Sequence, residues 1–471
     1  MVFKTERLEE LCELVIDCPH STPKWTDSGF IVLRNQNIRD GILDLATPSF
    51  TDEAGYKSRI KRAIPQADDI VFTREAPMGE VCLIPEGLRC CLGQRQVLLR
   101  AKKKINPHYL FWALQSSYVQ HQISWNEGTG TTVSNVRIPV IKDLKIPRLD
   151  TMEDYIASIM DSISMKSLAN QQINQTLEQI AQALFKSWFV DFEPVKANIA
   201  VLEAGGSQEE ATLAAMTAIS GKDADSLVLF ERDHPEQYAE LKATAELFPS
   251  AMQDSELGEI PVGWEVGELS DLALLNTSSW TKKNAPESVS YVDLANTKWG
   301  VINSVEEFIF SDAPSRARRI LKSLDTIIGT VRPGNGSYAY INKDGLTGST
   351  GFAVLTPKQE IFSEYIYLCA TSKESIERLA HLADGGAYPA VNADVVLSTQ
   401  CVIPSEQKDL ESLLREFSSK TKNIFSYSSH NLEQNIILSQ IRDTLLPKLL
   451  SGEITLPEAE TWAAQVDTQE A

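Results

Sequence analysis

The sequence NQTLEQIAQALFKSWF, residues 174–189, is the most regular part of a longer segment, 153–188, whose apolar residues recur at heptad spacing. This spacing predicts a long helix that packs lengthwise along another long helix. Two polar residues, Lys166 and Asn170, interrupt the apolar seam. One row of the seam consists of Ile156, Ile163, Leu177 and Leu184. A second row, three residues after positions 156, 170 and 177 of the first, consists of Ile159, Ile173 and Ile180.

The same pattern returns near the C-terminus in LSQIRDTLLPKLL, residues 438–450. A shift of 261 residues superimposes the two segments and carries even the interrupting Asn170 onto Asn431. Five coincidences in one register indicate an internal duplication that includes the long helix. The matched pairs are Ile163 with Ile424, Asn170 with Asn431, Leu177 with Leu438, Ile180 with Ile441 and Leu184 with Leu445.

The duplication extends into the segments that precede each helix. A repeat of about 260 residues is too long for a solenoid, so it indicates two domains and two connectors. The further matches are Leu8 and Leu11 with Leu269 and Leu272, Asn37 and Gly41 with Asn296 and Gly300, Thr73 with Thr330, Tyr109 with Tyr365, Asn135 with Asn392, and Ile146-Pro147 with Ile403-Pro404. The expected chain is α+β, with two mixed α/β modules in tandem: module 1 at 1–150, a long helix at 151–196, an acidic insert at 197–257, module 2 at 258–405, a second long helix at 406–455 and an acidic tail at 456–471.

Charge is unevenly distributed along the chain. The formal net charge is −20 at pH 7, which by itself argues against a nucleic-acid partner. Residues 1–150 carry 20 basic and 18 acidic groups, whereas residues 206–257 carry 3 basic and 11 acidic groups. Module 2 carries 12 basic and 17 acidic groups. Any phosphate binding would therefore depend on local basic patches of the modules.

Neither a membrane span nor a secretion signal is expected. No window approaches about 18 consecutive apolar residues, the length of a membrane span. The N-terminal sequence MVFKTERLEE has no apolar signal core, so a cytoplasmic location is expected. The seven cysteines form no C-x-x-C pair and no Cys/His cluster, so free thiols are expected, without disulfides or a zinc site.

Several short motifs stand out in each half of the chain. In the first half they are RNQNIRDG, DDIVFTREAPMGE, GTGTTVSN and LEQIAQALFKSWFVDFEPV. In the second half they are GEIPVGWEVGELSDLA, DTIIGTVRPGNG, GLTGSTGFAVL and LLPKLLSGEI. In its order and repetition of these motifs, the chain resembles the specificity subunits of type I restriction–modification enzymes. The resemblance covers nearly the whole chain apart from the region around 200–250, and no single motif is specific by itself.

The resemblance implies that each module is a target-recognition domain that reads one half of a split, asymmetric site in double-stranded DNA. It implies a non-catalytic subunit whose long helices hold the modules apart and dock two methyltransferase subunits, with a motor–nuclease subunit joining for restriction. S-adenosylmethionine, ATP and Mg²⁺ are then expected on the partner subunits. A protein-binding scaffold with two repeated modules is the alternative, and the net acidity favours it.

An enzymatic reading depends on Asn106-Pro107-His108-Tyr109, which imitates the N/D-P-P-Y motif of amino-methyltransferases. The second proline is a histidine here, and no glycine-rich cofactor loop precedes the motif. Since Asn caps helices and Pro suits the first helical position, we interpret this segment as the start of a helix. A phosphate loop for ATP is also absent from the sequence.

The candidate DNA-binding residues lie in basic runs, in glycine-rich turns and near strand ends. The basic runs precede the central strand of each module, which favours phosphate contact, with a solvated surface as the alternative. They contain Lys57, Arg59, Lys61 and Arg62 in module 1, and Arg316, Arg318 and Arg319 in module 2. Glycine-rich turns place Thr129, Thr131, Thr132 and Ser337 as donors to phosphates, with ordinary turn chemistry as the alternative. Arg74, Arg95, Arg332 and Tyr338 lie near strand ends, where an arginine can read guanine.

The two interrupting asparagines suggest how the helices pair. A twofold-related duplication would place the helices antiparallel, as in an antiparallel coiled coil. Asn170 and Asn431 would then meet near the midpoint and hydrogen-bond to each other, which would set the register of the pair. The alternative is that both side chains face solvent or a partner subunit.

Overall fold

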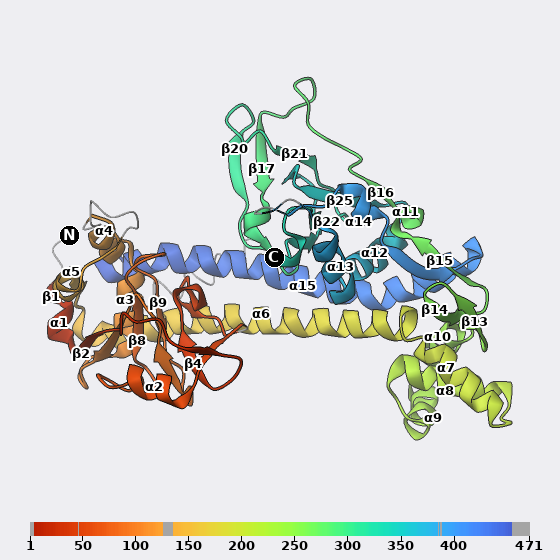
Figure 1. The fold of residues 1–471 in the computed structure, drawn as a ribbon, viewed down its shortest axis with the longest axis horizontal. Coiled ribbons are helices and arrows are strands. Elements are labelled where there is room, and N and C mark those ends of the chain that lie inside the picture. The colour runs from red at the N-terminus through yellow and green to blue at the C-terminus, as the bar shows by residue number, and fades with distance from the viewer. Residues whose placement is uncertain (1–3, 46, 126–134, 385, 387–388, 455–471) are drawn as a thin grey trace. The chain divides into compact units, whose positions relative to one another are not determined.

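The computed structural model describes residues 4–45, 47–125, 135–384, 386 and 389–454 (Figure 1). The chain divides into two compact units. Unit 1 is formed by Met1–Ala169 with Gln434–Ala471, and unit 2 by Asn170–Glu433. Each unit thus combines one module with a part of both long helices. The expected acidic tail at 456–471 lies outside the described residues.

The two long helices are α6, Glu153–Phe189, and α15, Gln407–Ser451. Helix α6 contains neither glycine nor proline, and acidic residues in its first turn and Lys186 in its last turn suit the helix dipole. It ends before the expected residue 196, because Phe192 takes a left-handed backbone conformation (φ 53°) and a new helix, α7, begins at Glu193.

The contacts within unit 2 show that α6 and α15 run antiparallel. Asn174 Nδ2 donates to Ser428 O at 3.0 Å. Phe185, further along α6, lies against Phe417, earlier along α15, with 6.4 Å between ring centroids. As the position rises on one helix it falls on the other, so the antiparallel pair expected from the duplication is confirmed.

Module 1 contains two four-stranded sheets. The scaffold sheet has the order β2-β11-β8-β9, and every neighbouring pair in it is antiparallel. The second sheet has the order β10-β4-β7-β3, in which β10 and β4 are parallel. The strand bounds are β2 Cys12–Asp17, β3 Trp25–Thr26, β4 Phe30–Leu33, β7 Ser49–Thr51, β8 Ile70–Thr73, β9 Val81–Leu83, β10 Cys90–Leu92 and β11 Gln96–Ala101. The remaining elements are β1 Thr5–Arg7, α1 Leu8–Leu11, β5 Ile38–Arg39, β6 Ile42–Leu43, α2 Glu53–Arg59, α3 Pro107–Gln115, α4 Ser117–Trp125, α5 Ile138–Asp143 and β12 Lys145–Pro147.

Module 2 repeats this plan. Its scaffold sheet has the order β16-β25-β22-β23, and its second sheet the order β20-β17-β24-β21 with β17 and β24 parallel. The strand bounds are β16 Ala273–Leu275, β17 Ser288–Val292, β20 Glu306–Ile309, β21 Ala317–Ile320, β22 Thr326–Gly329, β23 Tyr338–Tyr340, β24 Leu346–Ser349 and β25 Phe352–Pro357. The remaining elements are β15 Trp264–Glu268, α11 Leu269–Leu272, β18 Thr297–Lys298, β19 Val301–Ile302, α12 Ser363–Thr371, α13 Lys373–Leu382, α14 Ala393–Leu397 and β26 Gln400–Pro404.

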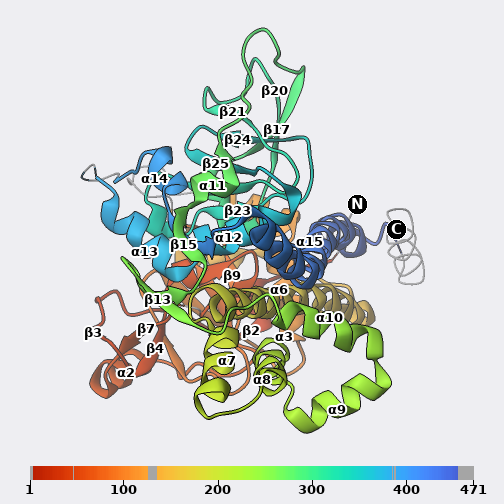
Figure 2. The same ribbon diagram turned by 90° about the vertical axis from the view of Figure 1, so that its right-hand side faces the viewer.

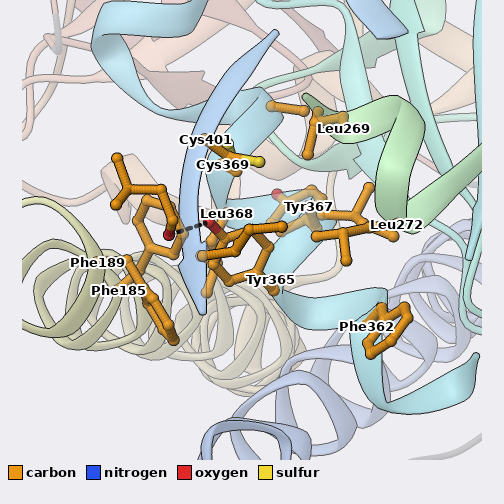
Figure 3. Close-up of a cluster of buried hydrophobic side chains, with 14 of the residues drawn as sticks. Phe185, Phe189, Leu269, Leu272, Phe362, Tyr365, Tyr367, Leu368, Cys369 and Cys401 are labelled. Atoms are coloured by element: carbon orange, nitrogen blue, oxygen red, sulfur yellow. Dashed lines mark hydrogen bonds between the residues drawn. The ribbon is translucent and has the colours of Figure 1, made fainter. Parts of the chain in front are cut away.

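The largest apolar cluster of unit 2 joins α6 and α15 to module 2. Phe185 and Phe189 of α6 face Tyr365 of α12, with ring centroids 5.3 and 4.8 Å apart (Figure 3). The Tyr365 hydroxyl donates to Val402 O on β26, the strand that precedes α15. The matching Tyr109 of module 1 donates to Pro147 O on β12, the strand that precedes α6. In both modules the duplicated tyrosine therefore binds the strand that precedes the long helix.

The acidic insert is a helical subdomain of unit 2 (Figure 2). It has its own small apolar core, which includes Met216, Leu227 and Leu241. Ser207 and Glu210 form a capping box at the start of α8, and Gly221 ends that helix in the left-handed conformation. Its helices are α7 Glu193–Glu203, α8 Gln208–Ser220, α9 Ala224–Asp233 and α10 Pro235–Ala245, followed by the hairpin of β13, Met252–Ser255, and β14, Gly258–Pro261.

Candidate nucleic-acid interface

The basic run of module 1 lies on helix α2 and in the turn that follows it. Its residue Arg59 is buried, and its guanidinium donates to Leu92 O at 2.6 Å, Ser21 O at 2.9 Å and Pro19 O at 3.1 Å. Burial lowers the pKa of Arg59. Arg59 therefore ties three loop carbonyls together, which is a structural role, and its predicted contact with DNA stays a prediction.

The other three cations of this run are exposed. Lys57 pairs with Glu53 one helical turn away, at 2.8 Å. Arg62 Nη1 donates to Asp17 O at 3.1 Å. Lys57, Lys61 and Arg62 thus remain candidates for phosphate contact.

The arginines near strand ends in module 1 have different surroundings. Arg74 is mostly buried, bonds to Asp17 at 3.0 Å and donates to Val136 O, so it joins two parts of the module. Arg95 is half-exposed, has a left-handed backbone (φ 67°) and lies 3.2 Å from Glu75. Arg74 thus has a structural role, and its contact with DNA stays a prediction. Thr129, Thr131 and Thr132 lie outside the described residues.

The basic run of module 2 lies at strand β21, where module 1 has helix α2. Arg316 donates to the Tyr291 hydroxyl at 2.9 Å and pairs with Asp293, and the Tyr291 bond raises its pKa. The Arg319 Nη1 donates to Ser279 Oγ at 3.3 Å, and burial lowers its pKa. Arg318 instead lies over the ring of Phe310, with 4.7 Å from Cζ to the ring centroid. The two basic runs match in sequence position but not in structure.

The remaining candidates of module 2 surround the short 3₁₀ helix η4, Pro333–Asn335. Arg332 has a left-handed backbone (φ 48°), and its N–H donates to Pro389 O. Ser337 is buried, donates to Leu294 O at 3.1 Å and accepts from Lys298 Nζ at 3.0 Å. Tyr338 is also buried, with its ring edge-on to Trp299. Ser337 and Tyr338 therefore support this loop, and their contacts with DNA stay predictions.

One kind of site was missed from the sequence, namely an arginine stacked on an aromatic ring. In module 1 the Arg34 guanidinium lies over Trp25, at 5.3 Å, and Arg89 lies over Phe30 and Tyr56. In module 2 the pair is Arg318 with Phe310. The only sequence signal is that tryptophan and arginine occur in β-rich segments, and nothing local shows which of them meet.

The central asparagines of the helix pair are buried, Asn170 completely and Asn431 almost so. Asn431 Nδ2 donates to Asn174 Oδ1 at 2.8 Å, and Asn174 donates in turn to Ser428 O. Asn431 Nδ2 thus bonds to Asn174, which lies one helical turn after Asn170 on α6. The bond between Asn170 and Asn431 stays a prediction.

The segment that imitates a methyltransferase motif is a helix start. Asn106 Oδ1 accepts from the N–H groups of His108 and Tyr109, at 2.9 and 3.2 Å, and Pro107 is the first residue of α3. Asn106 Nδ2 donates to Asp154 of α6. This side chain is fully engaged in capping and packing, which agrees with the structural interpretation of the motif.

Three further observations concern metal ligands, membrane spans and the cysteines. Among the described residues, no group of three or more His, Cys, Asp or Glu side chains is placed to hold a metal ion. No described helix is long and apolar enough to cross a membrane. All seven cysteines are free and buried, and burial raises the pKa of Cys12 to about 12.

Comparison with known proteins assigns the repeats. The family model of the type I restriction modification DNA specificity domain matches residues 3–179 and again 261–434, so the insert lies between the two matches. The specificity subunit of the type I restriction enzyme HindI from Haemophilus influenzae is 33% identical over 327 residues, which cover 66% of this chain and 69% of that protein. The MjaIX specificity subunit from Methanocaldococcus jannaschii is 23% identical and covers 86% of this chain and 82% of its own.

One solved structure is similar over nearly the whole length of this chain. The crystal structure of the type I restriction–modification S subunit from M. genitalium covers 95% of this chain and 96% of its own, with 14% identity and a TM-score of 0.47. The assignment rests on the family model and the curated relatives. Because the model matches both repeats and the Haemophilus relative is similar over two thirds of its length, this chain belongs to the specificity subunits of type I restriction–modification enzymes.

Proposed function

We propose that this chain is the DNA-reading subunit of its complex and that each module reads one half of a bipartite, asymmetric sequence. The proposal rests on a comparison of the two modules. Their scaffold sheets have the same plan, whereas their second sheets differ at one edge. A shared scaffold holds two readers in the same manner, and differences in the second sheet let them read different half-sites. This chain supplies recognition, while S-adenosylmethionine, ATP and Mg²⁺ belong to the partner subunits.

The proposed docking of the methyltransferase subunits is supported by an exposed apolar stripe on α6. Within unit 2, Ile173 and Ile180 are 46% and 50% exposed on one face of the helix. The positions between and after them on that face are Thr176, Ala183 and Ser187, so the stripe carries no charge. An uncharged apolar stripe on a long helix is typical of a surface that another helix covers. The motor–nuclease subunit would join this assembly.

A hollow beside the same helix adds to this surface. It has a volume of about 1050 Å³ and is lined by Phe185, Phe189 and Val190 together with residues of α13. Its lining is mainly apolar, with Lys186 and Glu374 among its charged residues. A partner helix on the α6 stripe would find further apolar contact area there.

Methylome sequencing of a host that expresses the whole system tests the proposal. The expected result is a split motif with one methylated base in each half. Replacing residues 1–150 with the module of another family member should then change one half of the motif only. A single continuous motif, or a change in both halves after the replacement, would overturn the assignment of one half-site to each module.

A further inference from the structure

The second sheets of the two modules differ at one edge. Both sheets share a trio of strands, β10-β4-β7 in module 1 and β24-β17-β20 in module 2, with one parallel and one antiparallel pairing. Module 1 extends its trio with β3, which pairs with β7. Module 2 extends its trio at the opposite edge, where β21 pairs with β24. Each module therefore has one edge strand that the other lacks.

In module 1 this edge strand carries an exposed tryptophan under an arginine. Trp25 lies on β3 and is 45% exposed. Arg34 follows β4, its Nη1 lies 3.5 Å from Ser49 Oγ on β7, and its Cζ lies 5.3 Å from the Trp25 ring centroid. The guanidinium thus crosses β7 and stacks on the edge strand. No carboxylate within the described part of the chain pairs with it.

In module 2 the edge strand carries the arginine itself. The pairing of β21 with β24 shifts register between Ala317 and Arg319, so Arg318 is the extra residue of a β-bulge. A bulge re-aims the side chain of its extra residue. The Arg318 Cζ lies 4.7 Å from the Phe310 ring centroid, and its Nη1 donates to Ala317 O at 2.7 Å.

We propose that Arg34 and Arg318 are the guanine-reading residues of module 1 and module 2. The inference rests on the proposed function, since it assumes that each module reads one half-site. Parts that are the same in both modules cannot distinguish two half-sites, so the base readers belong where the modules differ. Stacking on an aromatic ring holds the plane of a guanidinium, and the N–H edge of a guanidinium in plane matches O6 and N7 of guanine.

Four other arginines of the modules are engaged differently. Arg59 and Arg74 are held by carbonyls and a carboxylate inside module 1. Arg316 pairs with Asp293 in module 2. Arg89 is stacked too, but the rings beneath it, Phe30 and Tyr56, belong to an apolar cluster common to β4 and α2, so we assign it to the packing of that cluster.

The test uses the complete complex with Arg34→Ala and Arg318→Ala as separate variants, and it measures methylation rates on a library of sites with every base varied. Loss of one bidentate contact lowers discrimination at one base pair by about 5- to 150-fold. Arg34→Ala is expected to relax one guanine position in one half-site and to leave the other half-site as strict as before. Arg318→Ala is expected to do the converse. The variants Arg34→Lys and Arg318→Lys keep the positive charge but lack the paired N–H donors of the guanidinium. They should therefore relax the same positions.

The controls separate base reading from charge and from folding. Lys24→Ala removes an exposed cation that precedes Trp25 in the sequence and pairs with Asp52 at 3.2 Å. It should weaken binding to all sequences alike, with a salt slope smaller by at most about one. Arg89→Ala removes a stacked arginine and should leave the sequence preference unchanged. Each variant should keep its base preference at the half-site read by the other module. That preserved preference shows that the complex is still assembled.

The outcomes distinguish this inference from the proposed function. If the parent complex modifies no bipartite site, the proposed function fails. If the parent does so and both arginine variants keep every base preference, with uniform weakening only, then Arg34 and Arg318 contact phosphates and the inference is wrong. A base preference that Arg89→Ala changes and Arg34→Ala does not would also overturn it.

Discussion

Module 1 and module 2 each bury an aspartate at the start of the central scaffold strand, and they treat its charge differently. In both modules the carboxylate accepts a backbone N–H of the preceding turn, from Gln66 to Asp69 at 2.9 Å and from Lys322 to Asp325 at 2.8 Å. Arg100 makes two bonds of 2.7 Å to Asp69, whereas the matching residue of module 2 is Thr356.

This difference separates two features of the duplicated module, the hydrogen bond of the turn and the charge partner of the aspartate. The turn that needs the carboxylate as an acceptor is kept in both copies, because an unsatisfied N–H in a buried turn is costly. The charge partner is not kept. Burial raises the pKa of Asp325, which lacks an arginine. The backbone geometry is thus common to both modules, and the side-chain electrostatics diverged.

The largest effect is expected from Arg100→Met in module 1. This change leaves the Asp69 carboxylate buried without its partner, so we expect a loss of about 2–4 kcal/mol in the free energy of unfolding of unit 1. Calorimetry of the chain measures it. The matched change in module 2, Thr356→Met, removes no ion pair and should cost much less. Equal losses in both modules would show that the ion pair does not distinguish them.

A somewhat smaller loss is expected from Arg59→Met. The variant leaves three loop carbonyls without their donor, for about 2–3 kcal/mol. Arg316→Ala, at the matching place in module 2, removes a side chain that is largely exposed, so it should cost at most about 1 kcal/mol. Urea unfolding measures both. If Arg316→Ala were the more destabilising, the two basic runs would have the reverse of the roles assigned here.

The helix pair of unit 2 offers a third comparison, between single and double changes. Asn431→Leu leaves a buried Asn174 oxygen without its donor, at a cost of about 1–2 kcal/mol. The double variant Asn174→Leu with Asn431→Leu should recover most of that loss but enforce the spacing of the half-sites less strictly. A double-mutant cycle and methylation of sites with altered spacers measure the two effects. Additive losses and unchanged spacer strictness would exclude a register role for this pair.

The smallest effect is expected from Asp325→Asn. A carboxyl group whose pKa is raised in the folded state contributes stability below its unfolded pKa, and that stability is lost as the pH rises through the folded pKa. The parent should therefore lose stability relative to the variant as the pH rises from about 4, the ordinary pKa of an aspartate, toward neutral pH. Unfolding curves across this range measure the difference. A variant that loses stability at neutral pH would show that the ionised Asp325 is favourable after all.

Much of the architecture was predictable because its signals are local and repeated. The heptad pattern around residues 174–189 predicted the long helix, and Asn106-Pro107 predicted the start of α3. The 261-residue shift predicted two modules in tandem, each followed by a long helix. Helix periodicity and helix caps depend on neighbours within a few residues, so the local sequence is enough to predict them.

Only the tertiary structure decided which cations are available to a ligand and which residues meet. Arg59 reads as one member of an exposed run, but it is buried by carbonyls that lie 33, 38 and 40 residues away. Arg34 meets Trp25 only because β7 lies between β4 and β3, and Asn431 meets Asn174 only through the packing of two distant helices. Burial and pairing of a side chain depend on segments brought together by the fold, and no local pattern in the sequence carries that information.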